Sequence, residues 1–352
     1  MPTGIYRTGG PAYSSNTPPP LTHSQYVPSP KMPRFSSYRR PSRRSYRSRR
    51  PTSRRYPRRL TRTKRTYRRS RMSKRKVIDT VSLKKHDVYL SASAAGDNPV
   101  PTGSLVLGAP ARLFATPTNA NYGNIHAFLH VPTHKYLSQD GPQSIAARTS
   151  TRPWLRGFKE MYRLTPNDAS VWWHRRIVFA AKGNPFFKTG NSNGIVNFVG
   201  AEQSPTDLSL RQFRDLTGQS TGEYTTALDK TLNYLYDGVY QVDWIDPFTA
   251  STDKTRLTII SDRFQRIKSD NQAPAPVHRK HYTNIGKTIQ YDDEQNGLGM
   301  STNPLSTDAK PGIGDIYVYD LFGCPAPVTG GNTPGSSLLQ VSSTATLYWH
   351  EK

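Results

Sequence analysis

The residues best suited to chemistry in this sequence are arginines. Between Lys31 and Lys76 the chain carries 22 Lys and Arg, 18 of them Arg, and no Asp or Glu. Arg forms paired hydrogen bonds to phosphate oxygens and stacks on bases, whereas Lys acts mainly as a point charge. These like charges repel one another, and the stretch has too little apolar surface to offset chain entropy. We therefore expect a disordered, polycationic arm that binds a polyanion, of which nucleic acid is the commonest.

Four tyrosines, Tyr38, Tyr46, Tyr56 and Tyr67, are interleaved with these arginines. An aromatic ring stacks on any base, so the mixture suits single strands without sequence preference, although each tyrosine also fits the role of a solvated spacer. The same run is typical of a nuclear import signal. The cations that we expect to bind nucleic acid are Arg39, Arg40, Arg43, Arg44, Arg47, Arg49, Arg50, Arg54, Arg55, Arg58, Arg59, Arg62, Lys64, Arg65, Arg68, Arg69, Arg71, Lys74, Arg75 and Lys76.

The charge balance changes after Lys76. The first acidic residue is Asp79, and residues 77–352 carry 26 basic against 24 acidic groups. Residues 1–31, rich in Pro, Ser and Thr, form a third class that reads as disordered. The sequence thus divides into an extension (1–31), a basic arm (32–76) and a nearly neutral body (77–352) long enough to bury a core. Because Met32 would itself begin the arm, translation from Met32 is an alternative that the intact mass of the protein tests.

The body reads as β structure, because short apolar or alternating runs are separated by Gly, Pro, Asn and Asp. In 171–181 neither face is cleanly polar, which indicates a strand covered on both sides. Helical patterns at 204–216 and 225–238 look like short insertions. The expected strands are 80–90, 111–116, 155–164, 171–181, 255–261, 286–291, 315–322 and 343–350.

Eight strands with few helices indicate an all-β fold, a sandwich or an eight-stranded jelly roll with long loops. The longest connections are 91–110, 117–150 and 183–224. Such loops often carry contacts between subunits.

A second basic set lies inside the body. Arg148, Arg152 and Arg156 are evenly spaced, and Pro153 makes a helix across them unfavourable. In an extended chain the three arginines point to one face, where they would extend the nucleic-acid surface on the inner side of an assembly. Ordinary surface charge or ion pairs account for them equally well.

Catalytic and metal-binding patterns are sparse. No G-x-x-x-x-G-K-[ST] loop and no H-E-x-x-H motif occurs, so we expect no enzymatic activity, no cofactor and no metal site. The carboxylates of YDDEQNG (291–297) lie together, but neighbouring strand residues point to opposite faces. They fit a solvated loop best, then a partner for cations of another subunit, and least a metal site. The histidines of HRKH (278–281) lie among cations that disfavour a metal.

The single cysteine, Cys324, permits no disulfide within the chain, and its place beside a proline turn indicates a small packed residue. No stretch approaches the length of about 20 apolar residues that spans a bilayer, and the first 30 residues lack the pattern of a secretory signal. We expect a soluble, intracellular protein with no membrane partner.

Several pieces of the chain, in their order and spacing, resemble the capsid proteins of genomoviruses, small circular single-stranded DNA viruses related to geminiviruses. Residues 1–31 depart from that pattern. Besides the Arg-rich start after Met32, the matching pieces are ARTSTRPWLRGFKE (147–160), WWHRRIVFAAKG (172–183), YDGVYQVDWIDPFTA (236–250), TDKTRLTIISDRFQRI (252–267), YDDEQNG (291–297), GIGDIYVYDLF (312–322) and ATLYWHEK (345–352).

The resemblance implies an eight-stranded jelly roll, 60 copies of which form a T=1 icosahedral shell around a circular single-stranded DNA genome. It also implies a virion protein that enters the host nucleus, where import receptors would bind the arm. Sixty arms would carry roughly 1,400 positive charges, or about 1,260 from Met32, which balances on the order of a thousand phosphates. The alternative is a cellular nucleic-acid-binding structural protein, of ribosomal or chromatin type, with a basic tail.

Overall fold

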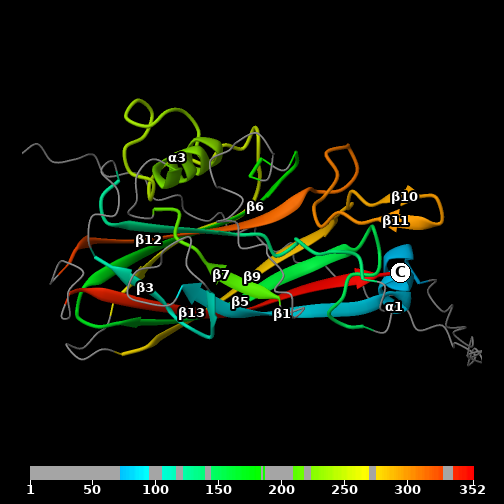
Figure 1. Ribbon diagram of the computed structural model, residues 1–352, viewed down its shortest axis with the longest axis horizontal. Helices are drawn as coiled ribbons and strands as arrows, with labels where there is room; N and C mark the ends of the chain where they lie inside the picture. The colour runs from blue at the N-terminus through cyan, green and yellow to red at the C-terminus, as the bar shows by residue number, and fades with distance from the viewer. Residues whose placement is uncertain are drawn as a thin grey trace, which may run out of the picture. The chain divides into compact units, whose positions relative to one another are not determined.

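Two β-sheets face each other in the computed structural model (Figure 1), which describes residues 72–94, 105–115, 122–138, 144–183, 185–186, 209–217, 223–268, 275–327 and 336–352. The larger sheet contains, in order, β2 (Leu105–Leu107), β1 (Leu83–Ala94), β13 (Leu338–Glu351), β5 (Trp154–Pro166) and β9 (Val277–Thr288). In addition, β7 (Leu210–Phe213) pairs with β1, and β3 (Ala111–Phe114) pairs with β13.

The smaller sheet contains, in order, β4 (Ile125–His130), β12 (Asp315–Ala326), β6 (Val171–Ala181) and β8 (Thr258–Ile267). Two short strands, β10 (Glu294–Asn296) and β11 (Gly299–Ser301), form a separate hairpin. The helices of the described residues are α1 (Lys74–Val81) and α3 (Glu223–Leu235). The expectation of an all-β fold is therefore confirmed.

The main core lies between the two sheets. Every second side chain of a strand points to the same face, so each sheet sends one set of residues into this space. Phe158 and Trp349 of the larger sheet cluster with Val318 of the smaller one. Tyr162 of the larger sheet clusters with Trp172 of the smaller one, and none of these five side chains is more than 2% exposed. Burying one large apolar side chain stabilises the fold by roughly 1.5–3 kcal/mol.

A charged network is buried in the same space and joins the sheets. Arg211 on β7 donates to Glu160 of β5 (Nε to Oε1, 3.0 Å) and to Asp320 of β12 (Nη2 to Oδ2, 2.5 Å). Arg176 on β6 pairs with the same two carboxylates, at 2.7 and 3.2 Å. Burial opposes the charge on Glu160, but these guanidinium groups still lower the pKa of Glu160 to about 2. The network is thus charge-balanced within the core.

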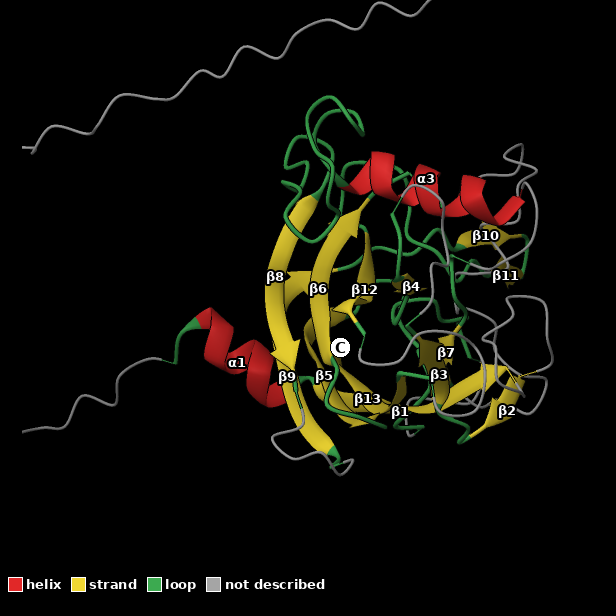
Figure 2. Ribbon diagram, turned by 90° about the vertical axis from the view of Figure 1, so that its left-hand side faces the viewer, coloured by secondary structure: helices red, strands yellow, loops and turns green. Residues whose placement is uncertain are grey.

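Helix α3 covers the outer face of the smaller sheet. Leu228, Leu232 and Leu235 recur at helical spacing, are fully buried, and belong to a cluster with Phe179 and Tyr317 of that sheet. Figure 2 shows α3 lying along this layer, on the side away from the larger sheet. Strand β6 is therefore covered on both faces, as its sequence predicted.

Most of the expected strands are confirmed. The range 171–181 coincides with β6, and 155–164, 315–322 and 343–350 lie within β5, β12 and β13. The range 286–291 is wrong, because β9 ends at Thr288 and includes HRKH. The buried positions of β9 include His281 and Thr283, so apolar and polar residues do not alternate regularly along this strand. Strand β4 lies in a stretch expected to be a connection.

One expected helix is confirmed and the other is wrong. The range 225–238 corresponds to α3. Within 204–216, of which the structure describes 209–216, residues Leu210–Phe213 form β7, parallel to Leu90–Ser93 of β1. Pairing with β1 and the buried ion pairs of Arg211 override the helical spacing of the leucines.

Helix α1 spans the expected boundary between arm and body after Lys76. The hydroxyl of Ser73 accepts a hydrogen bond from the backbone N–H of Lys76 (3.3 Å), which caps the helix. Strand β1 consequently begins at Leu83 rather than at residue 80. The compact unit that contains all described residues runs from Ser70 to Lys352.

Candidate nucleic-acid interface

The outward side of β1, β13, β5 and β9, which we call the open face, is the side of the larger sheet turned away from the core. Antiparallel register aligns its side chains in rows across the four strands. The rows are Lys84–His350–Trp154–Thr288, His86–Tyr348–Gly157–Asn284, Val88–Thr346–Lys159–Tyr282, Leu90–Thr344–Met161–Lys280 and, without β1, Ser342–Arg163–His278.

The carboxylates of these strands are confined to one side. The outward positions hold five cations and no carboxylate: Lys84, Arg156, Lys159, Arg163 and Lys280. The acidic residues of the same four strands are Asp87, Glu160 and Glu351, and all three are buried on the inward side. An open surface with cations alone attracts phosphate.

Aromatic rings are interleaved with these cations. The rings of Trp154 and His350 lie 5.1 Å apart between centroids, and those of His86 and Tyr348 lie 6.1 Å apart. Tyr282 is 42% exposed. A side chain at Gly157 would place its Cβ 2.6 Å from the Tyr282 hydroxyl, so glycine makes room for that ring. Exposed rings among cations are typical of surfaces that bind single strands.

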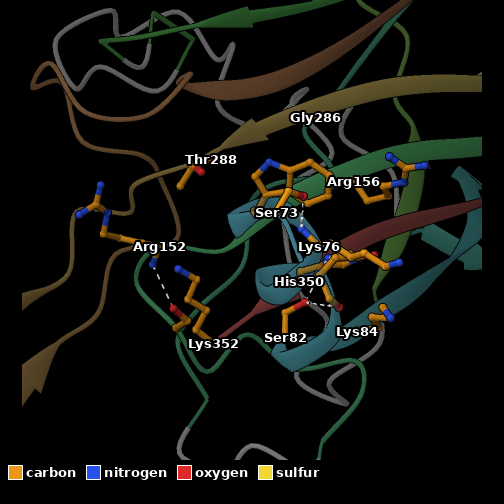
Figure 3. Close-up of a pocket in the computed structure, with 13 residues that line it drawn as sticks. Ser73, Lys76, Ser82, Lys84, Arg152, Arg156, Gly286, Thr288, His350 and Lys352 are labelled. Carbon is orange, nitrogen blue, oxygen red and sulfur yellow. Dashed lines mark hydrogen bonds and ion pairs between the residues drawn. The ribbon is translucent and has the colours of Figure 1, made fainter. Parts of the chain in front are cut away.

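The open face ends in a hollow of about 1300 Å³, which we call the basic hollow (Figure 3). Its lining includes five cations. They are Lys76 of α1, Lys84 of β1, Arg152 just before β5, Arg156 on β5, and Lys352 after β13. Asp79 supplies the one carboxylate side chain of the described lining.

His350 also lines the basic hollow, 3.7 Å from the Asp79 carboxylate. Burial lowers the pKa of His350, and the cations Lys84 and Arg156 lower it further against the attraction of Asp79. Near pH 7 the imidazole is therefore neutral, and the positive charge of the hollow comes from Lys and Arg.

Of the three evenly spaced arginines, two lie in the basic hollow and one does not. Arg152 and Arg156 are exposed there (Figure 3). The expectation that Arg148 faces outward with them is wrong, because its side chain is 1% exposed. It donates to both oxygens of Asp293 at 2.5 and 3.1 Å and lies 3.8 Å over the Tyr291 ring. Arg148 is a structural residue.

The carboxylates of YDDEQNG lie in different surroundings. Asp293 is buried by its pairing with Arg148, while Glu294 is exposed. The Oδ2 of Asp292 accepts a hydrogen bond from the Asn303 amide at 3.3 Å. Among the described residues, no group of His, Cys, Asp and Glu is arranged to hold a metal ion.

The two histidines of HRKH face opposite ways. His278 is exposed on the open face, whereas His281 is 3% exposed and packs edge-on against Tyr162 and His174.

Cys324 is buried, as predicted for a packed residue, and burial raises the pKa of its thiol to about 11.

The predicted arm cations from Arg39 to Arg71 lie outside the described residues. Lys74 and Arg75 belong to α1, and Lys76 is exposed in the basic hollow. The sequence prediction missed Trp154, Tyr348, Tyr282, Lys84 and Lys280. Part of the signal is the alternation of His278, Lys280 and Tyr282 along β9, whereas the register shift between Leu155 and Gly157 breaks the alternation along β5.

The comparisons with known proteins give no close relative. No protein-family model and no curated protein sequence matches the chain. Among solved structures, VP1 of Trichodysplasia spinulosa-associated polyomavirus in complex with sialylated glycooligomers has 8% identity and a TM-score of 0.12, covering 76% of this chain and 92% of that one.

An unassembled VP1 pentamer of Washington University polyomavirus has 9% identity and a TM-score of 0.12, covering 77% and 93%. The structure of infectious bursal disease virus has 11% identity and a TM-score of 0.11, covering 77% and 76%. Scores this low carry no argument about the chain.

Neither α1 nor α3 has the length and apolarity to cross a membrane.

Proposed function

We propose that this chain is a viral capsid protein that assembles into a shell and encloses circular single-stranded DNA, in keeping with its resemblance to genomovirus capsid proteins. The observation that carries the proposal is the charge segregation of the open face, with cations outward and carboxylates buried. A polyanion-binding side and a side covered by α3 suit the wall of a container.

The order of the strands supports an eight-stranded jelly roll as the architecture. Strands β1, β13, β5 and β9 adjoin in one sheet, and β4, β12, β6 and β8 adjoin in the other. Along the chain these eight strands cross repeatedly between the sheets, as in the double-sheet folds of many viral shells. The short strands β2, β3 and β7 are then additions to the larger sheet.

The assembly that we propose is a T=1 shell of 60 copies, in which the open face and the arm are turned toward the DNA. Closed symmetry requires each copy to offer the same complementary surfaces repeatedly. The arm would also bind host import receptors, so that the protein reaches the nucleus before assembly.

Particle formation tests this function. The full chain is expressed, its assemblies are separated by sedimentation, and they are imaged by electron microscopy before and after nuclease treatment. We expect uniform particles that retain nuclease-resistant single-stranded DNA. A chain that remains monomeric under every condition and protects no polynucleotide would refute the proposal.

Deleting residues 33–69 tests the division of labour. The deletion ends at Arg69 because the compact unit begins at Ser70 and Ser73 caps α1. Circular dichroism should show an unchanged β fold, while DNA affinity falls steeply and depends less on salt. In cells, the deleted chain should lose the nuclear accumulation of the full chain. An unfolded product or unchanged DNA affinity would contradict the two-part organisation.

A further inference from the structure

Phosphate binding alone does not explain why the rings of Trp154 and His350 line the basic hollow. Trp154 and His350 are register partners in adjacent strands, and their rings are inclined by 52°. Trp172 and Trp349 lie in the core, whereas Trp154 is partly exposed among cations. Leaving an indole in contact with water is unfavourable, and attraction of a polyanion alone does not need one.

Cations lie near Trp154 both along its strand and across the sheet. Arg152 precedes it by two residues and Arg156 follows by two, and both line the hollow with it. Lys84 occupies the same row of the sheet, one strand beyond His350. A flat aromatic ring thus has cations before and after it along its own strand and another cation across the sheet. Cations of this kind can bind phosphate.

We propose that the basic hollow binds an unpaired nucleotide, whose base stacks on Trp154 while Arg152, Arg156 and Lys84 contact the adjoining phosphates. This inference rests on the proposed function and deepens it, because it assigns single-strand selectivity to the body as well as to the arm. In a duplex the neighbouring bases cover both faces of each base, so the indole finds no partner. Every unpaired base has a π-face, so little sequence preference is expected.

Photocross-linking locates the subsite. The full chain is irradiated with oligothymidylate that carries 5-iodo-2′-deoxyuridine, and cross-linked peptides are identified by mass spectrometry. We expect a cross-link at Trp154 and none at Trp173, which is also partly exposed but lies in the smaller sheet. Cross-links confined to the arm would overturn the inference.

Abasic strands separate stacking from charge. The affinity of the full chain for oligothymidylate is compared with that for an abasic strand of equal length, at raised salt. Stacking of one base changes affinity by roughly 5- to 150-fold, so Trp154→Leu should reduce the preference for the normal strand by at least about 5-fold. Trp154→Phe should retain most of it, and Trp173→Leu all of it. Arg156→Gln should weaken the binding of both strands alike.

The outcomes distinguish the two proposals. If Trp154→Leu keeps the wild-type preference, the base subsite is wrong. If the wild-type chain binds normal and abasic strands equally well, the subsite again fails while polyanion binding stands. A wild-type chain that binds neither strand would remove the proposed function itself.

Discussion

Residues of one type take opposite roles in this protein according to the face on which they lie. Lys84 points into the basic hollow, while its neighbour Lys85 is buried and pairs with Glu351 at 2.9 Å. Arg152 is exposed, whereas Arg148 is enclosed by Asp293. Even spacing alone suggested one role for both arginines. The deciding partner lies 145 residues away in the sequence, where no local pattern reveals it.

Replacing Arg148 tests its structural role. Arg148→Ala leaves the buried Asp293 carboxylate without its cation, so the free energy of unfolding should fall by about 3–5 kcal/mol. Arg152→Ala, at an exposed position, should change it by less than about 0.5 kcal/mol. Urea denaturation of the unassembled protein measures both. Similar small losses in the two variants would show that Arg148 is not a structural residue.

Acid sensitivity should arise partly at His281. Burial, followed by the nearby charges of Arg176 and His174, lowers the pKa of His281 to about 4, against the attraction of Asp320 and Glu160. Both ring nitrogens lack a hydrogen-bond partner among the described residues. The fold therefore favours the neutral ring, and this contribution to stability is lost as pH falls from about 6.5 toward 4.

In His281→Phe this acid-induced loss should disappear. Between pH 6.5 and 4 the free energy of unfolding should fall less steeply with pH than in the wild type. The difference in slope should correspond to about one proton fewer taken up on unfolding. Denaturation at a series of pH values measures the difference. His134→Phe is a second test of the same effect, because burial also lowers the pKa of His134 to about 4 elsewhere in the fold, and it should reduce the slope by a similar amount. If the slope is unchanged in His281→Phe, His281 is not a source of the acid sensitivity.

At the level of elements, the sequence predicts the apolar and well-spaced parts of the fold. Helix α3 places large apolar residues at one helical period, and strand β6 is a run of mostly apolar residues on both faces, so the place of both elements could be read directly. Strand β9 could not, because its buried side includes His281 and Thr283. The outward residues of β9 and β5 were accordingly not recognised as one surface, since cross-strand register is not visible in one sequence.

The contribution of the basic hollow to DNA binding can be measured through its salt dependence. In the chain lacking residues 33–69, Arg152→Gln with Arg156→Gln removes two of the cations that we propose contact phosphate. The slope of log affinity against log salt concentration should then decrease in magnitude by about 1.4 for a single strand. Arg263→Gln with Arg266→Gln removes two exposed charges from β8, on the other sheet, and should leave the slope unchanged. Equal slopes in all three proteins would exclude the hollow as a phosphate site.

At the scale of the whole molecule, the segment 236–250 that follows α3 has properties opposite to those of the open face. It contains three Asp and no Lys or Arg. Val239, Val242 and Ile245 are 59%, 80% and 75% exposed. Carboxylates and aliphatic side chains are unsuited to DNA, and their exposure suits contact with another protein surface.

This segment is held in one conformation by its own contacts. Trp244 is buried and packs on Tyr236 and Tyr240. Asp243 accepts a hydrogen bond from the backbone N–H of Val239 at 2.7 Å. Its carboxylate occupies the space beside Gly238, where φ is +81° and a Cβ would collide with it. The exposed aliphatic side chains therefore need little ordering when they bind a partner, which lowers the entropic cost of association.

If neighbouring copies dock on this segment, Val242→Asp with Ile245→Asp should prevent assembly without unfolding the subunit. Each aliphatic side chain buried at a contact contributes roughly 1.5–3 kcal/mol, and closed symmetry repeats the loss at every equivalent contact. DNA affinity should stay at the wild-type level, because the open face is untouched. Leu298→Asp, at an exposed aliphatic residue between β10 and β11, is the matched control and should still give particles on sedimentation and electron microscopy. Normal particles from the double variant would show that the subunit contact does not lie on this segment. Loss of particles in both the double variant and Leu298→Asp would show that a new charge at any exposed aliphatic position prevents assembly, and the segment would then have no special role.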